Sequence, residues 1–386
     1  MTESILFQRN LDLNKLLEKK SVLLFGARGT GKSFYLRNQL HNLHTINLLN
    51  SSHYLRLQQN PNTLDEIALA HPKKIISIDE IQKIPELLNE VHRLIEEKSI
   101  RFLLTGSSAR KLKSTGANLL AGRAWLANMF PLNYAELNSI NSAKWSLKKN
   151  LTYGSLPAVW LSHDPVEELD NYIQTYIEME IKAEGIVRKI PAFSRFLKTA
   201  ALMNGELINY QNVSSDACVP VSTLKEHYKI LEDTLIGFSL EPWIESKKRK
   251  AITTGKFYFF DLGVLNLLSQ SSPESESSPV WGNRFETYII NEVKCANIYQ
   301  RRKLSFNYWR TTAQQEVDLL FGKTAIEIKF TRNIGNHHLN GLKCLMEEKS
   351  HKNFILVSND PIDRVQDGIH IMHYKSFLEK LWLGDF

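Results

Sequence analysis

A short apolar run leads straight into a glycine-rich loop near the start of this 386-residue chain, and a helical pattern follows the loop. The loop, residues 26–33, reads Gly-Ala-Arg-Gly-Thr-Gly-Lys-Ser and fits the pattern GxxxxGK[ST]. Residues 22–25 before it predict a buried strand, and residues 34–40 after it predict an amphipathic helix. Strand, loop and helix in this order separate a true phosphate-binding loop from a chance match. The sequence therefore predicts an α/β fold that binds a nucleoside triphosphate.

The residue types in this loop each suit a phosphate ligand. The glycines let backbone N–H groups turn inward around the phosphates. Lys32 supplies a positive charge at the β- and γ-phosphates, and the Ser33 hydroxyl can ligate Mg²⁺. The residues expected to contact the nucleotide are Gly26, Ala27, Arg28, Gly29, Thr30, Gly31, Lys32 and Ser33.

Two carboxylates follow a second apolar strand pattern, residues 75–78. In phosphate-loop enzymes the first such carboxylate holds Mg²⁺, so we expect Asp79 in that role together with Ser33. Glu80 is then expected to orient or deprotonate the attacking water. An Asp-Glu pair at a strand end is also common on protein surfaces, but the upstream loop favours the catalytic interpretation.

A third strand pattern, residues 101–105, is followed by Gly106, Ser107 and Ser108. A polar residue at the end of a strand beside the metal-binding strand can sense the γ-phosphate. Either serine could do this, or both could cap the helix expected near Ala109. The sequence leaves these two alternatives equal.

The order of these three motifs resembles the AAA+ superfamily of ATPases. Three further strings, residues 120–123, 130–137 and 153–159, are similar to a large prokaryotic family of predicted AAA+ ATPases fused to a C-terminal domain of unknown function. This resemblance implies ATP and Mg²⁺ as cofactors and a homo-oligomer, by analogy a hexameric ring.

The same resemblance implies that Arg123 is an arginine finger, which stabilises charge on the transferred phosphoryl group in a neighbouring subunit. The alternative is that Arg123 pairs with a local carboxylate. The family often carries Glu-x-Asp-x-x-Arg in its linking helices, whereas residues 178–183 here read Glu-Met-Glu-Ile-Lys-Ala and lack the arginine.

Composition indicates a multidomain globular protein. Hydrophobic residues make up 43% and charged residues 23% of the chain, and 386 residues exceed what one core usually supports. Three separated cysteines, no CxxC pair and no signal peptide predict a cytoplasmic protein without disulfides or structural zinc. No apolar run approaches the ~18 residues that spanning a bilayer requires, so no membrane partner is expected. The net charge of +7, concentrated in residues 1–150, is compatible with a polyanion partner such as DNA.

Four parts are expected along the chain. Residues 1–150 form an AAA+ ATPase domain, and residues 151–270 form a helical linker and a winged-helix-like domain. The Ser-, Pro- and Glu-rich residues 271–281 predict a flexible linker, and residues 282–386 an α/β domain resembling restriction endonucleases.

The middle part resembles a helix–turn–helix followed by a wing. Residues 208–217 and 221–231 predict two short helices separated at Pro220, and residues 238–260 predict two strands. The second helix carries Ser222, Thr223, Lys225, Glu226 and Tyr228. The basic residues at the hairpin tip, expected to reach DNA phosphates, are Lys247, Lys248, Arg249 and Lys250. The alternative is a lid or protein contact with a solvated tip.

Two strand patterns near the C-terminus place acidic and basic side chains close together. Asp318 lies near the start of the first, and alternation puts Glu327 and Lys329 on one face of the second. A helix pattern from Gly282 onward carries Glu286. These residues form a PD-(D/E)xK signature, which resembles the restriction-endonuclease-like fold and its archaeal Holliday-junction resolvase branch.

In this interpretation Asp318 and Glu327 bind Mg²⁺ with Glu286, and Lys329 orients the nucleophile or neutralises charge at the scissile phosphate. Glu292 is the alternative helix carboxylate, but it lies more than one and a half turns away from Glu286. The basic residues expected to dock a phosphate backbone are Arg301, Arg302, Lys303 and Arg310.

Three functions remain open on the sequence. The first is a Mg²⁺-dependent ATPase acting on DNA, with a nuclease-like domain that cleaves or binds DNA, including branched DNA. The second is an ATP-dependent regulator of a protein partner with a catalytically dead nuclease fold, and the third is a nucleotide-gated defence or toxin nuclease. The complete set of Glu286, Asp318, Glu327 and Lys329 favours the first and third.

Overall fold

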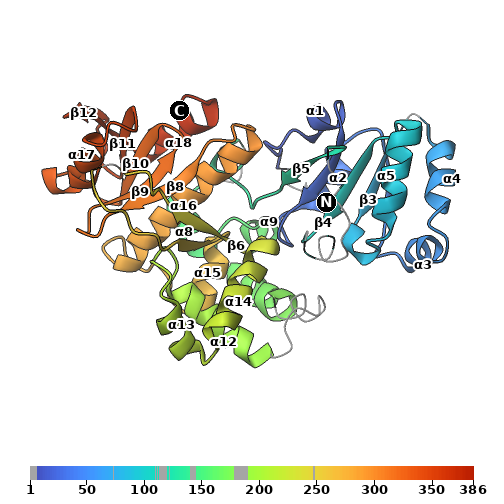
Figure 1. Ribbon diagram of the computed structural model, residues 1–386, viewed down its shortest axis with the longest axis horizontal. Helices are drawn as coiled ribbons and strands as arrows, with labels where there is room; N and C mark the ends of the chain where they lie inside the picture. Colours follow the sequence, from blue (N-terminus) through green and yellow to red (C-terminus); the bar gives the residue numbers. More distant parts are fainter. Residues whose placement is uncertain are drawn as a thin grey trace. The chain divides into compact units, whose positions relative to one another are not determined.

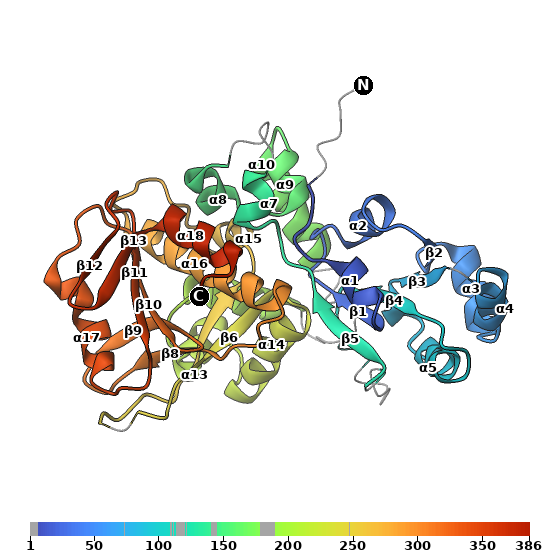
Figure 2. The same ribbon diagram turned by 90° about the horizontal axis from the view of Figure 1, so that it is seen from above.

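The chain is described here from a computed structural model, which covers residues 7–72, 74–108, 110, 112, 120, 122–139, 145–177, 190–246 and 248–386. It divides into two compact units (Figures 1 and 2). The first unit comprises Met1–Leu132 and Asp233–Ile236, and the second comprises Asn133–Glu232 and Gly237–Phe386. Residues 178–183, the altered family string, lie outside the described residues.

The first unit contains a five-stranded sheet with the order β2-β3-β4-β1-β5, and all its strand pairs are parallel. Its strands are β1 (Ser21–Phe25), β2 (Leu43–Asn47), β3 (Ile75–Asp79), β4 (Phe102–Gly106) and β5 (Ala124–Asn128). The strand β4 lies between β1 and β3, so one strand separates the phosphate loop from Asp79. This α/β sheet confirms the fold expected for the N-terminal part.

Helices cover this parallel sheet, which explains why its inner strands β1 and β4 are mainly apolar. Every residue of β1 and β4 is buried. The helices of the unit are α1 (Leu13–Leu17), α2 (Lys32–Asn38), α3 (Ser51–Gln59), α4 (Thr63–Ala70), η1 (Ile81–Lys83) and α5 (Leu87–Lys98). Side chains such as Val91 and Leu94 on α5 and Phe102 on β4 share one hydrophobic core.

The second unit is organised around an eight-stranded mixed sheet with the order β12-β13-β11-β10-β9-β8-β6-β7. Its strands are β6 (Gly237–Pro242), β7 (Lys256–Phe259), β8 (Phe306–Arg310), β9 (Glu316–Phe321), β10 (Thr324–Lys329), β11 (Asn353–Ser358), β12 (Arg364–Gln366) and β13 (Ile369–His373). The parallel pairing of β6 with β8, at Glu241↔Asn307 and Pro242↔Tyr308, joins strands from both sides of residues 271–281. The expected linker therefore lies inside one compact unit.

Helices of the second unit form a helical region and cover the C-terminal part of its sheet. They are α7 (Tyr134–Asn138), α8 (Leu147–Tyr153), α9 (Pro157–Leu161), α10 (Pro165–Asn171), η2 (Tyr172–Ile177), α12 (Ile190–Leu202), α13 (Tyr210–Ala217), α14 (Val221–Asp233), α15 (Leu262–Ser269), α16 (Pro279–Tyr299), η3 (Asn336–Leu339), α17 (Asn340–Met346) and α18 (Tyr374–Leu383). The helix α16 packs against β10 and α18, whereas α17 packs against β9 and β10. No helix in the described ranges is long and apolar enough to cross a bilayer.

The two expected helices of the helix–turn–helix are α13 and α14, separated by Cys218 in a left-handed conformation (φ 50°). Tyr228 does not lie on the outer face of α14. It is buried, with its ring 4.9 Å from that of Phe196 and 5.1 Å from that of Phe257. Because Tyr228 packs among these aromatic rings, its side chain is not available to contact a partner. The exposed residues of this face are Ser222, Thr223, Lys225 and Glu226.

The basic segment between β6 and β7 contacts the C-terminal part of the unit, which corrects the expectation that Arg249 reaches DNA phosphates. Arg249 donates to the Cys344 carbonyl (3.1 Å) and to a carboxylate oxygen of Glu347 (2.8 Å). The backbone N–H of Lys248 donates to Glu348 (3.0 Å), and Ile252 N–H donates to the Arg310 carbonyl (2.9 Å). Carboxylates beyond α17 thus neutralise Arg249. Lys247 lies outside the described residues.

Candidate functional sites

The phosphate loop has the backbone conformation that its glycines predict. Gly29 and Gly31 adopt positive φ values of 74° and 92°, which disfavour side-chain-bearing residues. A Cβ on Gly26 would lie 2.6 Å from the Met129 carbonyl oxygen, so the loop passes close to the chain just beyond β5. The ammonium of Lys32 donates to the carbonyls of Gly26 (2.6 Å) and Ala27 (3.2 Å). Lys32 is therefore folded back onto the loop itself.

The end of β3 meets the first turn of α2 at Asp79. Ser33 Oγ donates to Asp79 Oδ2 (2.9 Å), and Thr105 Oγ1 on β4 donates to Asp79 Oδ1. Asp79 is 3% exposed, so both its oxygens are held in one orientation. A hydroxyl and a carboxylate placed side by side are the oxygen ligands that Mg²⁺ takes in nucleotide sites. Ser33 and Asp79 therefore fit the metal, and Thr105 is a positioning residue that sequence analysis missed.

Glu80 occupies a strained position directly after β3. Its φ of 64° lies in the left-handed region, which is uncommon for a residue with a side chain and is found often at functional sites. Its carboxylate accepts a hydrogen bond from the amide of Gln82. The same amide donates to Ser107 Oγ at 3.2 Å, so Gln82 connects Glu80 to the residue that follows β4. No pattern in the sequence marks Gln82.

The two serines after β4 have different partners. Ser107 contacts Gln82, whereas Ser108 Oγ accepts from the backbone N–H of Arg110 (3.0 Å). Ser108 therefore acts as a local cap, and Ser107 lies next to the residue expected to activate water. The contacts of the two serines therefore differ, and sensing of the γ-phosphate by Ser107 stays a prediction.

Arg123 forms an ion pair with Glu96 of α5 within its own unit. The side chains are 36% and 52% exposed, so the pair lies at the surface, where such contacts contribute little to stability. Glu96 is therefore the local carboxylate that the alternative interpretation expected. Because the ion pair is weak, Arg123 can exchange Glu96 for another partner.

An N-terminal segment supports the phosphate loop. Arg9 donates to the Thr30 carbonyl (3.2 Å) and to the Phe130 carbonyl, and Tyr35 OH donates to the Leu11 carbonyl (2.6 Å). These contacts hold the segment against both the loop and α2. No sequence motif marks Arg9, because its partners are backbone carbonyls far away in the chain.

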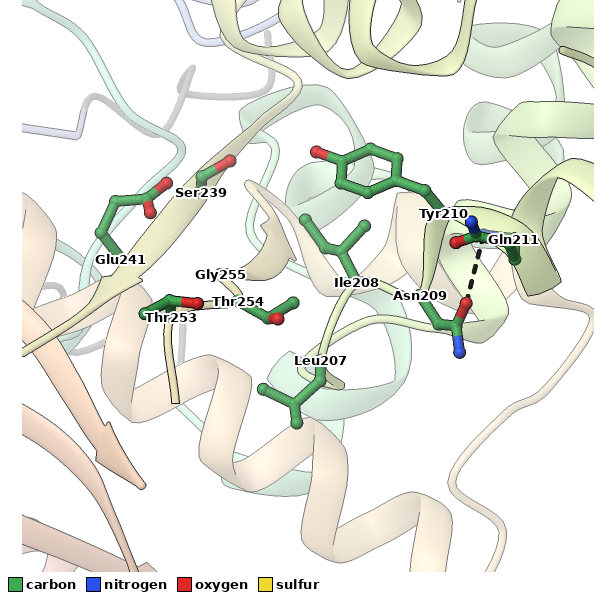
Figure 3. Close-up of a pocket in the computed structure, with 10 residues that line it drawn as sticks. All are labelled: Leu207, Ile208, Asn209, Tyr210, Gln211, Ser239, Glu241, Thr253, Thr254 and Gly255. Carbon is green, nitrogen blue, oxygen red and sulfur yellow. Dashed lines mark hydrogen bonds between the residues drawn. The ribbon is translucent and has the colours of Figure 1, made fainter. Parts of the chain in front are cut away.

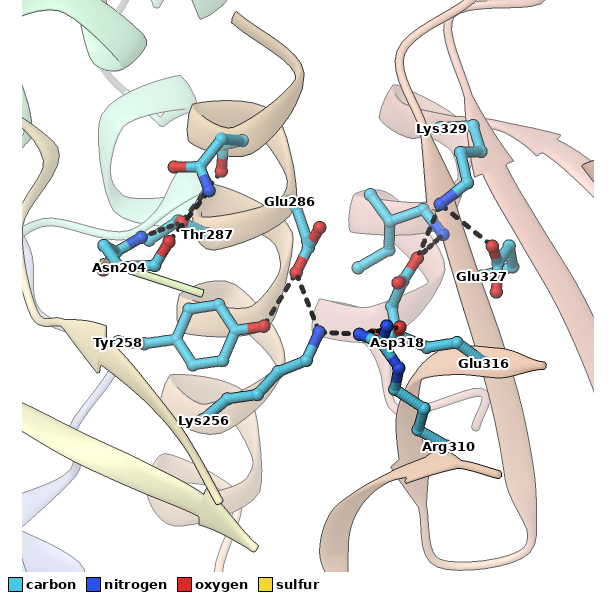
Figure 4. Close-up of polar contacts among 12 residues, drawn as sticks. Asn204, Lys256, Tyr258, Glu286, Thr287, Arg310, Glu316, Asp318, Glu327 and Lys329 are labelled. Atoms are coloured by element: carbon cyan, nitrogen blue, oxygen red, sulfur yellow. Dashed lines mark hydrogen bonds and ion pairs between the residues drawn. The ribbon is translucent and has the colours of Figure 1, made fainter. Parts of the chain in front are cut away.

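The four residues of the expected nuclease set lie in one charged cluster of the second unit (Figure 4). Lys329 Nζ lies 2.9 Å from Glu327 Oε1 and 3.4 Å from Asp318 Oδ2. The ladder between β9 and β10 ends at Leu319↔Ile326, and Asp318 Oδ2 accepts the N–H of Ile328 (2.8 Å) in place of a main-chain carbonyl. This interruption of the ladder brings the Asp318 carboxylate to Glu327 and Lys329.

The other half of the cluster contains residues outside the expected set. Figure 4 shows Lys256 of β7 extending between Glu286 and Glu316, with its Nζ 3.9 Å from Glu286 Oε1 and 2.5 Å from Glu316 Oε1. Tyr258 OH donates to Glu286 Oε1 (2.7 Å), and Arg310 Nη1 lies 3.0 Å from Glu316 Oε2. Lys256 and Tyr258 come from the middle part of the chain. Arg310 is held by Glu316, so it does not present a free charge for phosphate.

The three carboxylates expected as metal ligands are not gathered around one point. No group of three or more His, Cys, Asp or Glu side chains arranged to hold a metal ion occurs in the described parts of the chain. A two-carboxylate site nevertheless fits Mg²⁺, which usually keeps several waters and takes one or two protein carboxylates plus substrate phosphates. Glu327 is 6% exposed, and its Oε2 has no hydrogen-bond partner among the described residues, which points to a missing ligand.

Burial and mutual repulsion raise the pKa values of two carboxyls in the cluster. Burial first, and the charge of Asp318 second, raise the pKa of Glu286 to about 7 and that of Glu327 to about 8. The charge of Asp318 raises the pKa of Lys329, so this lysine stays protonated. These two carboxyls therefore hold their protons more tightly than exposed ones, because burial and the charge of Asp318 disfavour their ionised forms.

Glu292 is separated from this cluster. Its two carboxylate oxygens accept from the Tyr134 N–H and from Trp382 Nε1, each at 2.8 Å. Burial raises the pKa of Glu292 to about 8. It connects α16 to α7 and α18, whereas Glu286 faces Lys256 and Asp318.

The basic residues expected to dock phosphates differ in exposure, and some of them are engaged in contacts within the chain. Arg302 donates to the Phe386 carbonyl (2.6 Å) and the Leu381 carbonyl (3.4 Å), where it supports the end of α18. Arg301 is half-buried, and the exposed members are Lys248, Lys250 and Lys303. The basic surface is therefore smaller than the sequence predicts.

A cavity of about 630 Å³ lies at the beginning of α13 (Figure 3). Its lining residues are Leu207, Ile208, Asn209, Tyr210, Gln211, Ser239, Glu241, Thr253, Thr254 and Gly255. The lining includes one carboxylate and no basic side chain, so the cavity is poorly suited to a phosphate group.

The parallel sheet, the loop and the Ser33–Asp79 contact together form a phosphate-loop α/β unit. Residues 18–138 match the family model described as an AAA domain. Residues 144–275 and residues 281–377 match two models that are each described as a domain of unknown function. No curated protein matches the chain. A solved structure, the Aeropyrum pernix ORC1 protein in complex with DNA, matches with 14% identity over 69% of this chain and 93% of that chain. Its TM-score of 0.25 means that the two chains do not superpose as wholes.

Proposed function

We propose that the chain is a Mg²⁺-dependent ATPase whose first unit hydrolyses ATP. The observation that carries this proposal is the contact of Ser33 with Asp79, between a lysine-bearing phosphate loop and the strand that ends at Glu80. Bound Mg²⁺ would neutralise charge on the β- and γ-phosphates. Lys32 would bind the phosphate oxygens, and Glu80, held by Gln82, would orient water toward the γ-phosphate.

Phosphate release by the full-length chain tests this proposal. We expect ATP hydrolysis with Mg²⁺, none in excess EDTA, and loss of nucleotide binding in Lys32→Ala. The exposed Lys83→Ala is the matched control, because Lys83 follows Glu80 closely but lies outside the loop. Equal hydrolysis by Lys32→Ala and wild type would refute the proposal.

A second candidate function concerns the charged cluster: Mg²⁺-dependent cleavage of DNA, including branched DNA. It is supported by Asp318, Glu327 and Lys329 within contact distance and by the orphaned Glu327 Oε2. Asp318 and Glu327 would hold the metal, which supplies an activated water. Lys329 would neutralise charge at the scissile phosphate.

Nuclease assays distinguish this candidate from its alternatives. Branched DNA, linear duplex, single-stranded DNA and RNA are incubated with the protein, Mg²⁺ or Mn²⁺, and ATP or no nucleotide. Cleavage that Glu327→Ala and Lys329→Ala abolish without loss of DNA binding supports a nuclease, and cleavage only with ATP supports the nucleotide-gated alternative. Binding without cleavage leaves a degenerate nuclease fold. If no nucleic acid binds at low salt, where ionic contacts are strongest, an ATPase that regulates a protein partner replaces this candidate.

We also propose that the ATPase assembles as a ring in which Arg123 completes a neighbour's site. Its exposed pair with Glu96 supports this proposal, because the guanidinium lies at the surface and can change partners. Light scattering with ATP tests the assembly, and a fully active monomer would refute it.

A further inference from the structure

The charged cluster consists of two halves with different charge balance. In one half, Glu286 and Glu316 face two cations, Lys256 and Arg310. In the other half, Asp318 and Glu327 share the single cation of Lys329. When both carboxylates are ionised, as metal ligands are, the second half has one negative charge more than its cation balances, and the orphaned Glu327 Oε2 lies in this half.

We propose that the cluster takes one divalent cation, held by Asp318 and Glu327, and that Lys256 permanently fills a second cation position between Glu286 and Glu316. This inference rests on the metal site proposed above and deepens it. It assigns a role to a residue of the middle part of the chain and makes Glu286 a partner of Lys256 rather than a metal ligand.

The fixed position of Lys256 supports this role. The residue is 4% exposed and lies at the start of β7, where it pairs with Leu240 of β6. Its Nζ also lies 5.3 Å from the centre of the Tyr308 ring, and this contact adds a second attraction for the cation. A buried ammonium with two carboxylate partners is costly to remove, because its partners would be left unpaired.

The chemistry of the two halves would then differ. Two-metal nucleases place their ions about 3.5–4 Å apart, and each ion stabilises one oxygen of the reacting phosphate. An ammonium supplies charge and hydrogen-bond donors, but it cannot generate a metal-bound hydroxide. Lys256 would therefore neutralise and position the Glu286 side of the cluster, while the single ion lies with Asp318 and Glu327.

Counting bound Mn²⁺ ions tests the proposal without measuring cleavage. The full-length chain carries Ser33→Ala and Asp79→Asn, which remove the metal ligands of the ATPase site, and is titrated without nucleotide. Free Mn²⁺ is read by electron paramagnetic resonance. We expect one bound ion in this background, none after Glu327→Gln, and two after Lys256→Met, which keeps the side-chain length and removes the charge. Lys256→Arg and the exposed Lys323→Met should both retain one ion.

Two ions in the background protein would overturn the role of Lys256 and leave the proposed metal site intact. A single ion in a folded Lys256→Met protein would do the same. No bound ion in the background would overturn both the inference and the metal site beneath it. If Lys256→Met does not fold, as judged by its circular dichroism, the background count and the Lys256→Arg count still decide the outcome.

Discussion

Ser33 and Asp79, 46 positions apart in the chain, are joined by a 2.9 Å hydrogen bond at the carboxyl end of the parallel sheet. The second oxygen of Asp79 accepts from Thr105 on the strand between them. The carboxylate is therefore oriented before any ligand arrives, which lowers the cost of binding a metal–nucleotide complex.

Glu80→Gln should keep ATP binding and lower turnover by about 10²–10³-fold, the usual effect of removing one catalytic contact. The amide has nearly the shape of the carboxylate but cannot accept a proton from water. Binding is measured with a fluorescent ATP analogue, and turnover by phosphate release. The exposed Glu86→Gln serves as the control. Wild-type turnover in Glu80→Gln would remove Glu80 from the mechanism.

Ser107→Ala and Ser108→Ala should have different effects. Ser107→Ala removes the hydroxyl that contacts Gln82, so we expect slower ATP turnover with little change in melting temperature. Ser108→Ala removes a cap and should cost about 1 kcal/mol of stability at unchanged turnover. Calorimetry and phosphate release measure the two effects. If the variants exchange these phenotypes, our assignment of the serines is wrong.

Arg123→Ala should lose ATPase activity as a pure protein and regain part of it when mixed with the inactive Lys32→Ala protein. In the mixture an intact loop can meet an intact arginine from another subunit. The control is Glu96→Gln, which releases Arg123 from its local pair and should leave activity at or above wild type. A mixture no more active than its two components would rule out action between subunits.

The metal-free protein should lose stability as pH rises from about 4.5 to about 8, and the window to measure is the upper part of this fall, from about pH 7 to about pH 8. The folded-state pKa values of Glu286 and Glu327, about 7 and about 8, exceed the ordinary value of 4.5, so the folded state retains protons that the unfolded state releases. This contribution is complete below pH 4.5 and disappears as pH rises through the folded values. Histidines whose pKa burial lowers, such as His227, are already neutral in this window.

Glu327→Gln should reduce this fall in melting temperature, as measured by calorimetry in EDTA. It should not abolish the fall, because the raised pKa of Glu292 acts with the same sign. The exposed Glu66→Gln is the control. An identical slope in Glu327→Gln and wild type would contradict the pKa assignment.

Gly341→Ala should destabilise the second unit strongly. A Cβ at this position of α17 would lie 1.9 Å from the carbonyl oxygen of Glu316, so the helix would have to move away from β9. Gly282→Ala is the matched control, because nothing lies within 4 Å of its added Cβ. We expect the control to gain about 0.5–1 kcal/mol, since alanine is the better helix former. Similar melting temperatures for the two variants would contradict this packing.

Features encoded in short segments could be predicted from the sequence. The phosphate loop, Asp79 with its strand, and the strands of Asp318 and Glu327 each depend on neighbouring residues, and their types follow from local pattern. The choice of Glu286 over Glu292 also agrees with its place beside the cluster, because helical spacing separates the two carboxylates.

Features that depend on the pairing of distant strands could not be predicted. Thr105 reaches Asp79 only because β4 lies beside β3, and Lys256 reaches Glu316 only because β6 and β7 extend the C-terminal sheet. The partners of Arg249 lie beyond α17, nearly a hundred residues later in the chain, which is why four consecutive basic residues looked like a free wing. A local sequence pattern contains no information on such partners.

The pairing of β6 with β8 also has a consequence for the inheritance of this gene. These strands belong to segments that match two separate family models, residues 144–275 and residues 281–377. Recombination between the two segments would remove β6 from beside β8, which would keep only β9 as its neighbour, and would expose an open strand edge that favours aggregation. Selection should therefore transmit both segments together, and a lineage that loses one should soon lose the other.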